Sequence, residues 1–441
     1  MKIAIAGTGY VGLVTAVCLA DYGHDVTCVD VDEEKISFLN RTHKSPIYEK
    51  GLDFLMEKNA SHLTYTTDYK SAYREADVIF IGVGTPEKRD GSANLSYVFR
   101  VARQIAESIE RECVVVVKST VPIGTNEKVE QFLHEHCAPG VCVHIASNPE
   151  FLSQGTAVND TLFASRIVLG VEDAFSKETL LALYHDFPGE KVVTNRRSAE
   201  MIKYASNDFL AVKISYINEI ANLCEDIGAN IDDVAHGMGL DQRIGNKFLH
   251  AGIGYGGSCF PKDTKALHWL SAYHELELKT VKAAIEVNDH QKFKLLRKAS
   301  KYYSDLKGKK VAILGLTFKP GTDDLREAPS LANVPILLED GAEIRAYDPV
   351  GIKNFQKYYP DEIVYTEDID TAIDGADICL IFTEWPEIKA YPLARYREKM
   401  RQPIVLDGRN CYALEQVRQA GIIYESIGRA SIVPEMREAK R

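Results

Sequence analysis

The 441-residue sequence lacks any uninterrupted apolar run of about 18 residues, the length that a membrane-spanning helix needs. It also lacks an excess of positive charge, because 63 Asp and Glu outnumber 52 Lys and Arg and give a net charge of −11. These two absences argue against a membrane protein and against nucleic acid as the main partner. The nine cysteines are odd in number, and no secretory leader precedes the first apolar segment, so we expect reduced thiols in the cytoplasm.

The first 150 residues alternate short apolar runs with helical stretches, a pattern typical of a doubly wound α/β fold. The run Lys2–Ala6 leads through a glycine turn into a predicted helix at Val11–Tyr22 and a second strand at Asp25–Val29. Further strands are predicted at 78–83, 114–117 and 141–145. Because these runs do not alternate polar and apolar residues, we expect a parallel sheet that is covered on both faces.

The same pattern returns near the other end of the chain. Three segments match in the same order: 310–315 with 2–7, 343–348 with the strand ending at Asp30, and 375–382 with 75–82. Such an internal repeat predicts two Rossmann-like domains of the α/β class. The tail from Gly428 is charged, and we expect its end to be loose.

The stretch between the two repeats shows no strand pattern. A helix is predicted from Ser198, as its N-cap, to Ile227, and another from Lys279 to Tyr303. The first is apolar around much of its circumference, so we expect it to be buried on several sides, to connect the two domains and to offer a surface for self-association. The predicted domains are therefore 1–197, a helical middle domain at 198–303, and 304–441.

A glycine-rich turn, Gly7-Thr8-Gly9-Tyr10-Val11-Gly12, follows the first strand and opens the first helix. In this context the first glycine makes the tight turn, the second lets the backbone approach a pyrophosphate, and the third permits close packing of helix and strand. Asp30 closes the next strand, where a carboxylate accepts hydrogen bonds from ribose hydroxyls. No arginine follows Asp30 directly, which favours NAD over NADP. A turn without nucleotide and an S-adenosylmethionine site are the alternatives.

One cysteine lies between a glycine-rich loop and a proline, in the segment Gly256–Asp263. Pro261 is typical of the first turn of a helix. Cys259 is then placed where helix N–H groups face outward and favour the thiolate, with Lys262 nearby. A small buried cysteine beside a tight turn is the alternative interpretation.

Several other polar residues fall where a ligand site would need them. Lys203 and Asn207 are four residues apart on an apolar helix, where an unpaired ammonium is costly, so the lysine belongs either to a structural salt bridge or to a site. Thr85, Thr120 and Glu150 follow predicted strands, at the edge where open α/β sheets bind ligands. Three cationic loop residues could recognise phosphate: Arg243, Lys319 and Arg326.

A cluster of potential metal ligands has a less specific pattern. His134, His136, Cys137, Cys142 and His144 lie within a short span, but their spacing matches no structural zinc site. We therefore predict no metal site.

Taken together, these motifs resemble those of the UDP-glucose/GDP-mannose dehydrogenase family of four-electron nucleotide-sugar dehydrogenases, over essentially the whole chain. The matching segments are 7–12, 117–122, 148–152, Lys203 with Asn207, 243–263, and 318–322 with Arg326. No position that the family uses for chemistry departs from its pattern.

The resemblance implies an oxidoreductase that uses NAD to convert UDP-glucose to UDP-glucuronate, in nucleotide-sugar metabolism that serves polysaccharide biosynthesis. Two successive oxidations of a primary alcohol require that the aldehyde is retained, and Cys259 would hold it as a thiohemiacetal and then as a thioester. The alternatives are a GDP-mannose or UDP-N-acetylmannosamine dehydrogenase, or a non-catalytic protein that binds NAD and nucleotide-sugars. The resemblance further implies an NAD-binding first domain, a central domain for dimerisation, a UDP-sugar-binding last domain and a cytoplasmic homodimer.

The resemblance also implies roles for individual residues. Lys203 and Asn207 would stabilise oxyanions, and Asp263, Glu150 and Thr120 would activate water and relay protons. The residues expected at NAD are Gly7, Gly9, Tyr10, Val11, Gly12, Asp30, Lys35, Thr85, Thr120, Glu150, Lys262 and Arg326. Those expected at the UDP-sugar are Glu150, Phe151, Leu152, Ser153, Lys203, Asn207, Phe248, Leu249, His250, Ala251, Gly252, Gly256 and Lys319, with Arg243 supplied by a neighbouring subunit.

Overall fold

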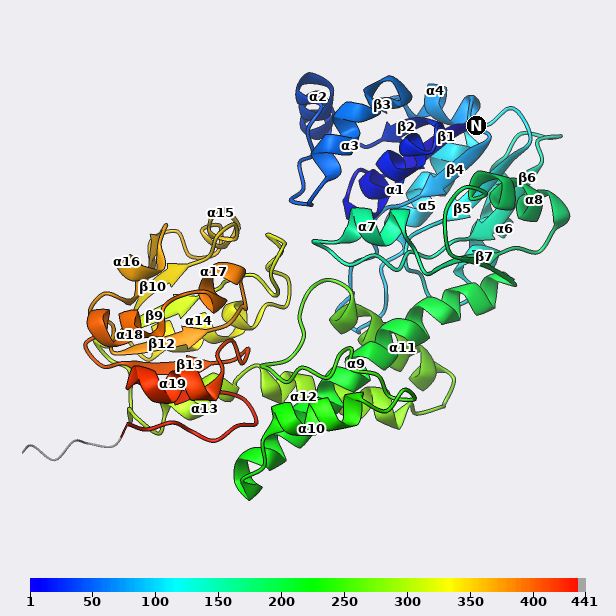
Figure 1. Cartoon of the computed structure of the whole chain (residues 1–441). Helices are drawn as coiled ribbons and strands as arrows, with labels where there is room; N and C mark the ends of the chain where they lie inside the picture. The colour runs from blue at the N-terminus through cyan, green and yellow to red at the C-terminus, as the bar shows by residue number, and fades with distance from the viewer. Residues whose placement is uncertain (435–441) are drawn as a thin grey trace, which may run out of the picture. The chain divides into compact units, whose positions relative to one another are not determined.

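The computed structural model describes residues 1–434 (Figure 1). The predicted loose end of the tail falls at 435–441, outside the described residues. The chain divides into two compact units, and each is an α/β structure with its own sheet. Unit 1 comprises 1–206 and 265–276, and unit 2 comprises 207–264 and the chain from Glu277 onward.

Unit 1 contains an eight-stranded sheet in the order β3-β2-β1-β4-β5-β6-β7-β8. Its strands are β1 (Lys2–Ala6), β2 (Asp25–Val29), β3 (Leu63–Thr66), β4 (Val78–Ile81), β5 (Cys113–Val117), β6 (Val143–Ser147), β7 (Arg166–Gly170) and β8 (Glu190–Thr194). All neighbours are parallel except β6 and β7. The first two strands match the prediction to the residue, β6 begins two residues later than predicted, and β3, β7 and β8 were not predicted.

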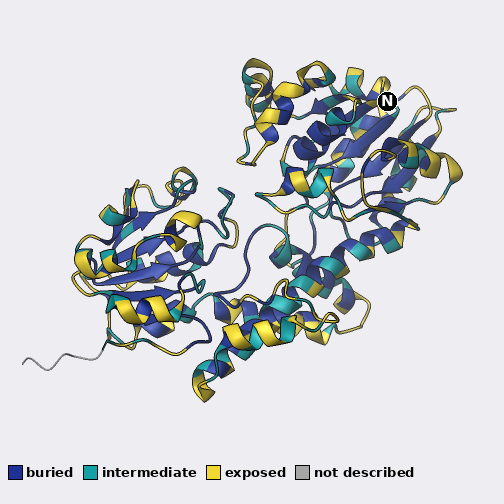
Figure 2. Cartoon of the chain, viewed as in Figure 1, coloured by how far each residue is buried: buried dark blue, intermediate teal, exposed yellow. Residues whose placement is uncertain are grey.

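Helices cover both faces of this sheet. They are α1 (Tyr10–Asp21), α2 (Glu33–Thr42), α3 (Leu52–Lys58), α4 (Tyr69–Arg74), α5 (Ser96–Ala106), α6 (Thr125–His136), α7 (Ala157–Leu162) and α8 (Ala174–Leu183), with a short 3₁₀ turn at Ala60–His62. Alternate residues of β1 enter different cores: Ile3 and Ile5 pack in one hydrophobic cluster, whereas Ala4 and Ala6 pack in another. The expectation of a sheet buried on both faces is therefore confirmed, and most strands are dark blue in Figure 2.

Unit 2 contains a second, fully parallel sheet of six strands in the order β11-β10-β9-β12-β13-β14. The strands are β9 (Lys310–Leu314), β10 (Glu343–Tyr347), β11 (Ile363–Thr366), β12 (Ile378–Ile381), β13 (Ile404–Asp407) and β14 (Ile423–Glu425). Its helices are α14 (Pro329–Glu339), α15 (Ile352–Phe355), α16 (Ile369–Ile373), α17 (Pro386–Lys389), α18 (Leu393–Lys399) and α19 (Leu414–Ala420). The order repeats that of the first six strands of the chain, which confirms the predicted second Rossmann-like fold.

The segment 198–303 is helical and forms no strand, as predicted. Its longest element is α9 (Arg196–Ile227), and the two units divide within α9 and again within α11 (Phe260–Tyr273). Ser198 is not the N-cap, because the Oδ1 of Asn195 accepts a hydrogen bond from the Ser198 N–H at 2.7 Å and α9 begins earlier. Gly228, at φ +76°, ends the helix as predicted.

The predicted single helix over 279–303 is instead two helices, α12 (Lys279–Gln291) and α13 (Lys294–Ala299). The carbonyl of Lys292, at the break, accepts a hydrogen bond from the Asn333 side chain at 2.8 Å. A short helix, α10 (Ile231–Gly239), completes this part of unit 2. Among the described residues, no helix combines the length and apolar character of a membrane span.

The expectation that α9 is buried on several sides is wrong for one of its faces. Ile217 is fully buried, but four large apolar side chains with similar spacing remain 48–66% exposed. They are Phe209, Tyr216, Leu223 and Ile227. This α9 stripe lies in unit 2 and presents an apolar surface with no covering segment of the described chain.

Candidate active site

The glycine turn between β1 and α1 has a geometry that excludes other residues at two positions. Gly7 has φ +95°, and a Cβ on Gly12 would lie 1.9 Å from the carbonyl oxygen of Gly7. A Cβ on Gly9 would meet nothing within 4 Å, so the backbone at Gly9 faces open space. Tyr10 and Val11 follow in the first turn of α1, where backbone N–H groups lack intrahelical partners. This turn therefore fits the pyrophosphate of a dinucleotide.

Asp30, directly after β2, is held as an acceptor beside this turn. Its Oδ2 accepts hydrogen bonds from the Thr8 N–H at 2.9 Å and from the Lys35 ammonium at 3.0 Å. Burial raises the pKa of Asp30, but the bonds from Thr8 and Lys35 more than offset this effect and lower it overall. Asp30 is thus an ionised acceptor for ribose hydroxyls, so the residues present fit NAD. Thr8 was not among the predicted site residues.

Two residues predicted at the carboxyl edge of the sheet are brought together. The Thr85 hydroxyl, buried after β4, donates to the backbone carbonyl of Thr120 after β5 at 2.8 Å. This hydrogen bond joins the carboxyl ends of two adjacent strands, at the edge of the sheet where open α/β folds bind ligands.

Lys203 finds its partner in Glu150. The Nζ of Lys203 lies 2.9 Å from the Glu150 Oε1, and the two side chains are 3% and 6% exposed. The second carboxylate oxygen of Glu150 accepts the Leu152 N–H at 2.8 Å. The Phe151 ring lies against two cations, 5.4 Å from the Lys203 Nζ and 4.1 Å from the Arg166 guanidinium. The predicted alternatives for Lys203 are therefore not exclusive, because a buried ion pair joins two residues that both belong to the predicted site.

Lys118 lies next to this pair and was missed from the sequence. Burial lowers its pKa to about 8, an effect that the charge of Glu150 partly opposes. Its ammonium donates to the Asn148 Oδ1 at 2.9 Å. With Glu150, Phe151, Leu152, Arg166 and Tyr184, it lines a cavity of about 50 Å³. The sequence could have identified Lys118 as a site residue, because Lys118 and Asn148 both lie in segments that carry the resemblance. Ser153, by contrast, is exposed, and its N–H donates to Asp160 at 2.9 Å.

Cys259 immediately precedes α11, and its carbonyl accepts the first helical hydrogen bond, from the Asp263 N–H at 2.8 Å. The predicted place at a helix N-terminus is therefore confirmed, and the partial positive charge there favours a thiolate. Cys259 is partly exposed, whereas Cys18, Cys28 and Cys113 are buried, and burial raises the pKa of each of these three to about 12. All nine cysteines are free thiols.

Asn207 and Asp263 contact each other although they are far apart in the chain. The Asn207 side-chain amide donates to the Asp263 Oδ2 at 2.7 Å, and the ammonium of Lys262 contacts the other carboxylate oxygen. Asn207 is 7% and Asp263 only 1% exposed. Unit 2 therefore holds a buried carboxylate with two donors one helical turn beyond Cys259.

The loop before Cys259 packs against backbone. A Cβ on Gly256 would lie 2.3 Å from the carbonyl oxygen of Glu327. The next residue, Gly257, donates its N–H to the Arg326 carbonyl at 2.8 Å. Gly257 also has φ +83°, and a Cβ on it would lie 2.8 Å from the Phe318 ring, so both positions favour glycine.

The predicted substrate loop 248–252 is anchored by buried side chains. Leu249 and Ala251 are buried, whereas Phe248, at φ +63°, is 40% exposed. Gly252 donates its N–H to the Asn218 Oδ1 at 2.8 Å and accepts a bond from Gln291 at 2.8 Å.

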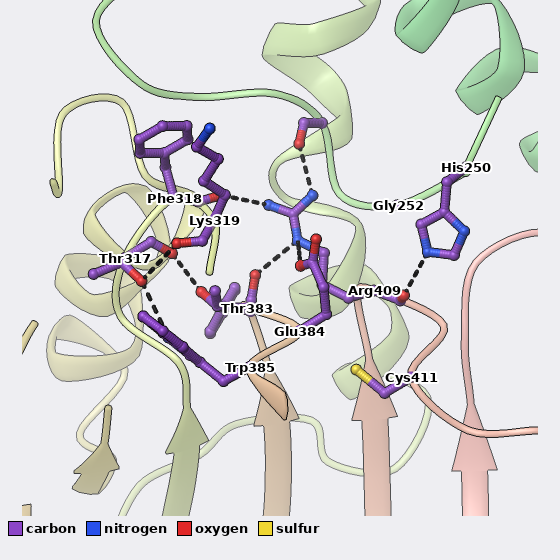
Figure 3. Close-up of polar contacts among 12 residues, drawn as sticks. His250, Gly252, Thr317, Phe318, Lys319, Thr383, Glu384, Trp385, Arg409 and Cys411 are labelled. Atoms are coloured by element: carbon purple, nitrogen blue, oxygen red, sulfur yellow. Dashed lines mark hydrogen bonds and ion pairs between the residues drawn. The ribbon is translucent and has the colours of Figure 1, made fainter. Parts of the chain in front are cut away.

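Arg409 organises the same region and was missed from the sequence (Figure 3). Its guanidinium donates to the carbonyls of Phe382 at 2.8 Å, Gly254 at 2.9 Å and Phe318 at 3.2 Å. The carbonyl of Arg409 meets the His250 ring at 2.9 Å. Lys319 follows Phe318 and extends beside its ring in Figure 3, with the ammonium 5.5 Å from the ring centre. Arg409 therefore ties the 250–254 loop to the Lys319 loop.

Two predicted cations are engaged locally. Arg243 donates to Asp241 at 2.6 Å, and its side chain is 89% exposed. Arg326 donates to Asp324 at 2.6 Å.

The structure brings together part of the dismissed metal cluster. Ligand atoms of Glu112, Cys142 and His144 lie within 4.8 Å of one another. The ring nitrogens of His144 also lie 3.1 Å from a Glu112 carboxylate oxygen and 3.0 Å from an Asp173 carboxylate oxygen. Of the five residues considered from the sequence, Cys142 and His144 thus lie together, and Glu112 is added by the structure.

Comparison with known proteins decides the family. Residues 1–188 match the NAD binding domain of the UDP-glucose/GDP-mannose dehydrogenase family, 197–290 its central domain, and 312–414 its UDP binding domain. The chain belongs to this family. It is an NAD-dependent dehydrogenase, as the turn at Gly7–Gly12 predicted.

Individual relatives are similar over nearly their whole length. The chain is 49% identical to the UDP-glucose 6-dehydrogenase YwqF of Bacillus subtilis (strain 168), covering 98% of this chain and 99% of the relative. Among solved structures, a UDP-glucose dehydrogenase from the archaeon Pyrobaculum islandicum superposes with a TM-score of 0.91 at 37% identity, covering 97% and 98% of the two chains. A UDP-D-ManNAc dehydrogenase from Pyrococcus horikoshii superposes with a TM-score of 0.86 at 30% identity, covering 97% and 99%.

Proposed function

We propose that this family member oxidises UDP-glucose to UDP-glucuronate with NAD, through a covalent intermediate on Cys259. The choice of UDP-glucose is supported by the 49% identical UDP-glucose 6-dehydrogenase, because the UDP-D-ManNAc dehydrogenase is less similar, at 30% identity. The proposed domains are 1–197 for NAD, 198–303 for dimerisation and the cysteine loop, and 304–441 for the UDP-sugar. The family matches at 1–188, 197–290 and 312–414 support this division.

The observation that carries the mechanism is the place of Cys259 at the N-terminus of α11. Removal of a hydride and a proton from the C6 alcohol leaves an aldehyde, to which the thiolate adds by forming a C–S bond. A second such removal converts the thiohemiacetal into a thioester. Water then attacks the carbonyl carbon, the C–S bond breaks, and the carboxylate leaves while the thiolate is restored. The aldehyde is never released, because it is covalently bound between the two oxidations.

The surrounding polar residues fit the remaining steps. Lys203 and Asn207 donate toward the oxygen that becomes negatively charged, which stabilises the tetrahedral intermediates. Asp263 takes the proton of the attacking water, and Glu150 and Thr120 relay protons. NAD, when bound, accepts the electron pair at each oxidation.

Two sets of residues bind the ligands in this proposal. NAD is held by Gly7, Gly9, Tyr10, Val11, Gly12, Asp30, Lys35, Thr85, Thr120, Glu150, Lys262 and Arg326. The UDP-sugar is held by Glu150–Ser153, Lys203, Asn207, Phe248–Gly252, Gly256 and Lys319. The anchored loop at Gly252 and the carbonyl contacts of Arg409 support the inclusion of Phe248–Gly252 and Lys319 in the second set.

We further propose that the enzyme is a cytoplasmic homodimer. The α9 stripe supports self-association, because four exposed apolar side chains along a helix are costly unless a partner covers them. Arg243, whose side chain is 89% exposed, reaches the partner subunit's substrate in this proposal. Nine free thiols suit a reducing compartment.

The test is the NADH yield with a panel of nucleotide-sugars. We expect about two NADH per UDP-glucose consumed and no accumulation of free aldehyde, because Cys259 retains the half-oxidised sugar. GDP-mannose and UDP-N-acetylmannosamine should turn over at least about tenfold more slowly at equal concentration. About one NADH per sugar, with free aldehyde in solution, would refute the covalent route, and a preference for another sugar would refute the substrate.

A further inference from the structure

Asp208 is a buried acid beside the proposed reacting centre that the mechanism above does not use. It follows Asn207 on α9, in unit 2, and is 3% exposed. Neither of its carboxylate oxygens has a hydrogen-bond partner anywhere in residues 1–434. A buried carboxylate without partners is costly, and this cost is avoided when the group is protonated and therefore neutral. The burial of Asp208 without hydrogen-bond partners therefore requires an explanation.

The charged group that acts on Asp208 is Asp263, which contacts the neighbouring Asn207. Burial, and to a smaller extent the negative charge of Asp263, raise the pKa of Asp208 to about 8. Tyr255 is the other titratable side chain close by, and burial raises the pKa of its phenol to about 12, with smaller contributions from Asp208 and Asp289. The phenol is therefore neutral too. The negative charge that acts on Asp208 is that of Asp263.

Of the two acids Asp208 and Asp263, only Asp263 receives hydrogen bonds from the surrounding donors. The Asn207 amide and the Lys262 ammonium both bind Asp263, one on each carboxylate oxygen. One cation therefore balances one anion, and the buried group is neutral overall if Asp208 keeps its proton. A second negative charge would have no cation to balance it and would compete with Asp263 for the same amide and ammonium.

We propose that Asp208 is a positioning residue, a neutral carboxylic acid that keeps the buried pair at a single negative charge and so holds Asp263 and Asn207 in their reactive arrangement. The proposal rests on the proposed roles of Asp263 in activating water and of Asn207 in binding the oxyanion. When Asp208 loses its proton, Asn207 and Lys262 are shared between two carboxylates, and both roles are impaired. Asp208 thereby limits turnover at alkaline pH.

The test compares the pH dependence of kcat in the wild type and in Asp208→Asn, which has nearly the same shape and is neutral at every pH. Because the wild type loses the neutral form above about pH 8, the ratio of variant to wild-type kcat should rise by roughly tenfold between about pH 7 and about pH 9. Glu200→Gln is the matched control, because Glu200 is also a buried α9 acid with a raised pKa, mainly through burial. Its ratio should not change with pH.

A ratio for Asp208→Asn that stays flat with pH would overturn the proposal. A structural role alone would lower kcat equally at all pH values, so the shape of the profile separates the two. The NADH yield per UDP-glucose, measured for the same variant at neutral pH, tests the proposed function independently and remains at about two if only the Asp208 proposal fails.

A second measurement does not require that the variant folds. In wild-type enzyme labelled with ¹³C at the aspartate carboxyl carbons, one resonance should titrate near pH 8, far above the ordinary range of about 3.5. If all aspartate resonances have titrated below about pH 6, Asp208 is ionised at neutral pH and the proposal is wrong.

Discussion

Replacing Lys203 with methionine separates a structural from a catalytic role for the buried pair with Glu150. Methionine has a similar length but no charge, so Lys203→Met leaves the Glu150 carboxylate buried at 6% exposure without its cation. Removing one partner of a buried pair costs about 3–5 kcal/mol of unfolding free energy. Glu150 keeps the hydrogen bond from the Leu152 N–H, so we expect the lower end, about 3 kcal/mol.

Calorimetry measures the first effect. For a unit of this size, a loss of about 3 kcal/mol should lower the Tm by roughly 6–12 °C. The double variant Lys203→Met with Glu150→Gln should recover most of that loss, because neither member of the pair is then charged. Lys2→Met is the matched control: its ion pair with Glu75 has a similar distance, 2.8 Å, but both side chains are more than half exposed. We expect no resolvable change in Tm for that variant.

Turnover measures the second effect. Loss of an oxyanion donor typically lowers kcat by about 10²–10³-fold, and the double variant should not recover it, because the donor is still missing. If the double variant recovered both Tm and kcat, Lys203 would serve stability only. If Lys203→Met left the Tm unchanged, the reasoning from burial would be refuted.

Three further predictions concern other parts of the molecule. Gly12→Ala should abolish NAD binding in fluorescence titrations, because its Cβ would lie 1.9 Å from the carbonyl oxygen of Gly7; unchanged affinity would contradict the assigned turn. The proposed homodimer should become a monomer in light scattering when Tyr216→Asp is introduced in the α9 stripe, whereas Tyr358→Asp, equally on an exposed tyrosine but outside the stripe, should leave it unchanged. Asp208 binds a proton in the folded state up to about pH 8, whereas an unfolded aspartate releases it near pH 4, so folding stability falls as pH rises between these values. Relative to Asp208→Asn, the wild type should therefore lose about 3 kcal/mol in denaturant titrations between about pH 5 and about pH 7, and equal slopes would contradict the raised pKa.

The strand boundaries were predictable from the sequence where an apolar run ends at a turn glycine or at a ligand-binding carboxylate. β1 ends before the turn at Gly7 and β2 ends before Asp30, and both strands match the prediction to the residue. β8 could not be found in this way, because its residues are only partly buried and include Glu190 and Lys191. The break between α12 and α13 depends on a hydrogen bond from Asn333, which is distant in the sequence.

The site residues were predictable as types, but their partners were not. Lys203 clearly needed a partner, yet Glu150 lies 53 residues away in the chain. The same holds for Asn207 and Asp263, which are 56 residues apart. Asp208 was overlooked because an aspartate on a helix ordinarily faces solvent. Only the packing of α9 shows that it is buried beside Asp263.

The central claim is that Cys259 carries the sugar between the two oxidations, and rapid-quench mass spectrometry of the Cys259 peptide tests it most directly. During turnover of UDP-glucose, the account predicts a fraction of this peptide heavier by the mass of the bound nucleotide-sugar. With Cys259→Ser the adduct should be absent or should persist without hydrolysis, since an alkoxide is a poorer leaving group than a thiolate. An unmodified Cys259 peptide throughout turnover, together with near wild-type kcat for Cys259→Ser, would contradict the account.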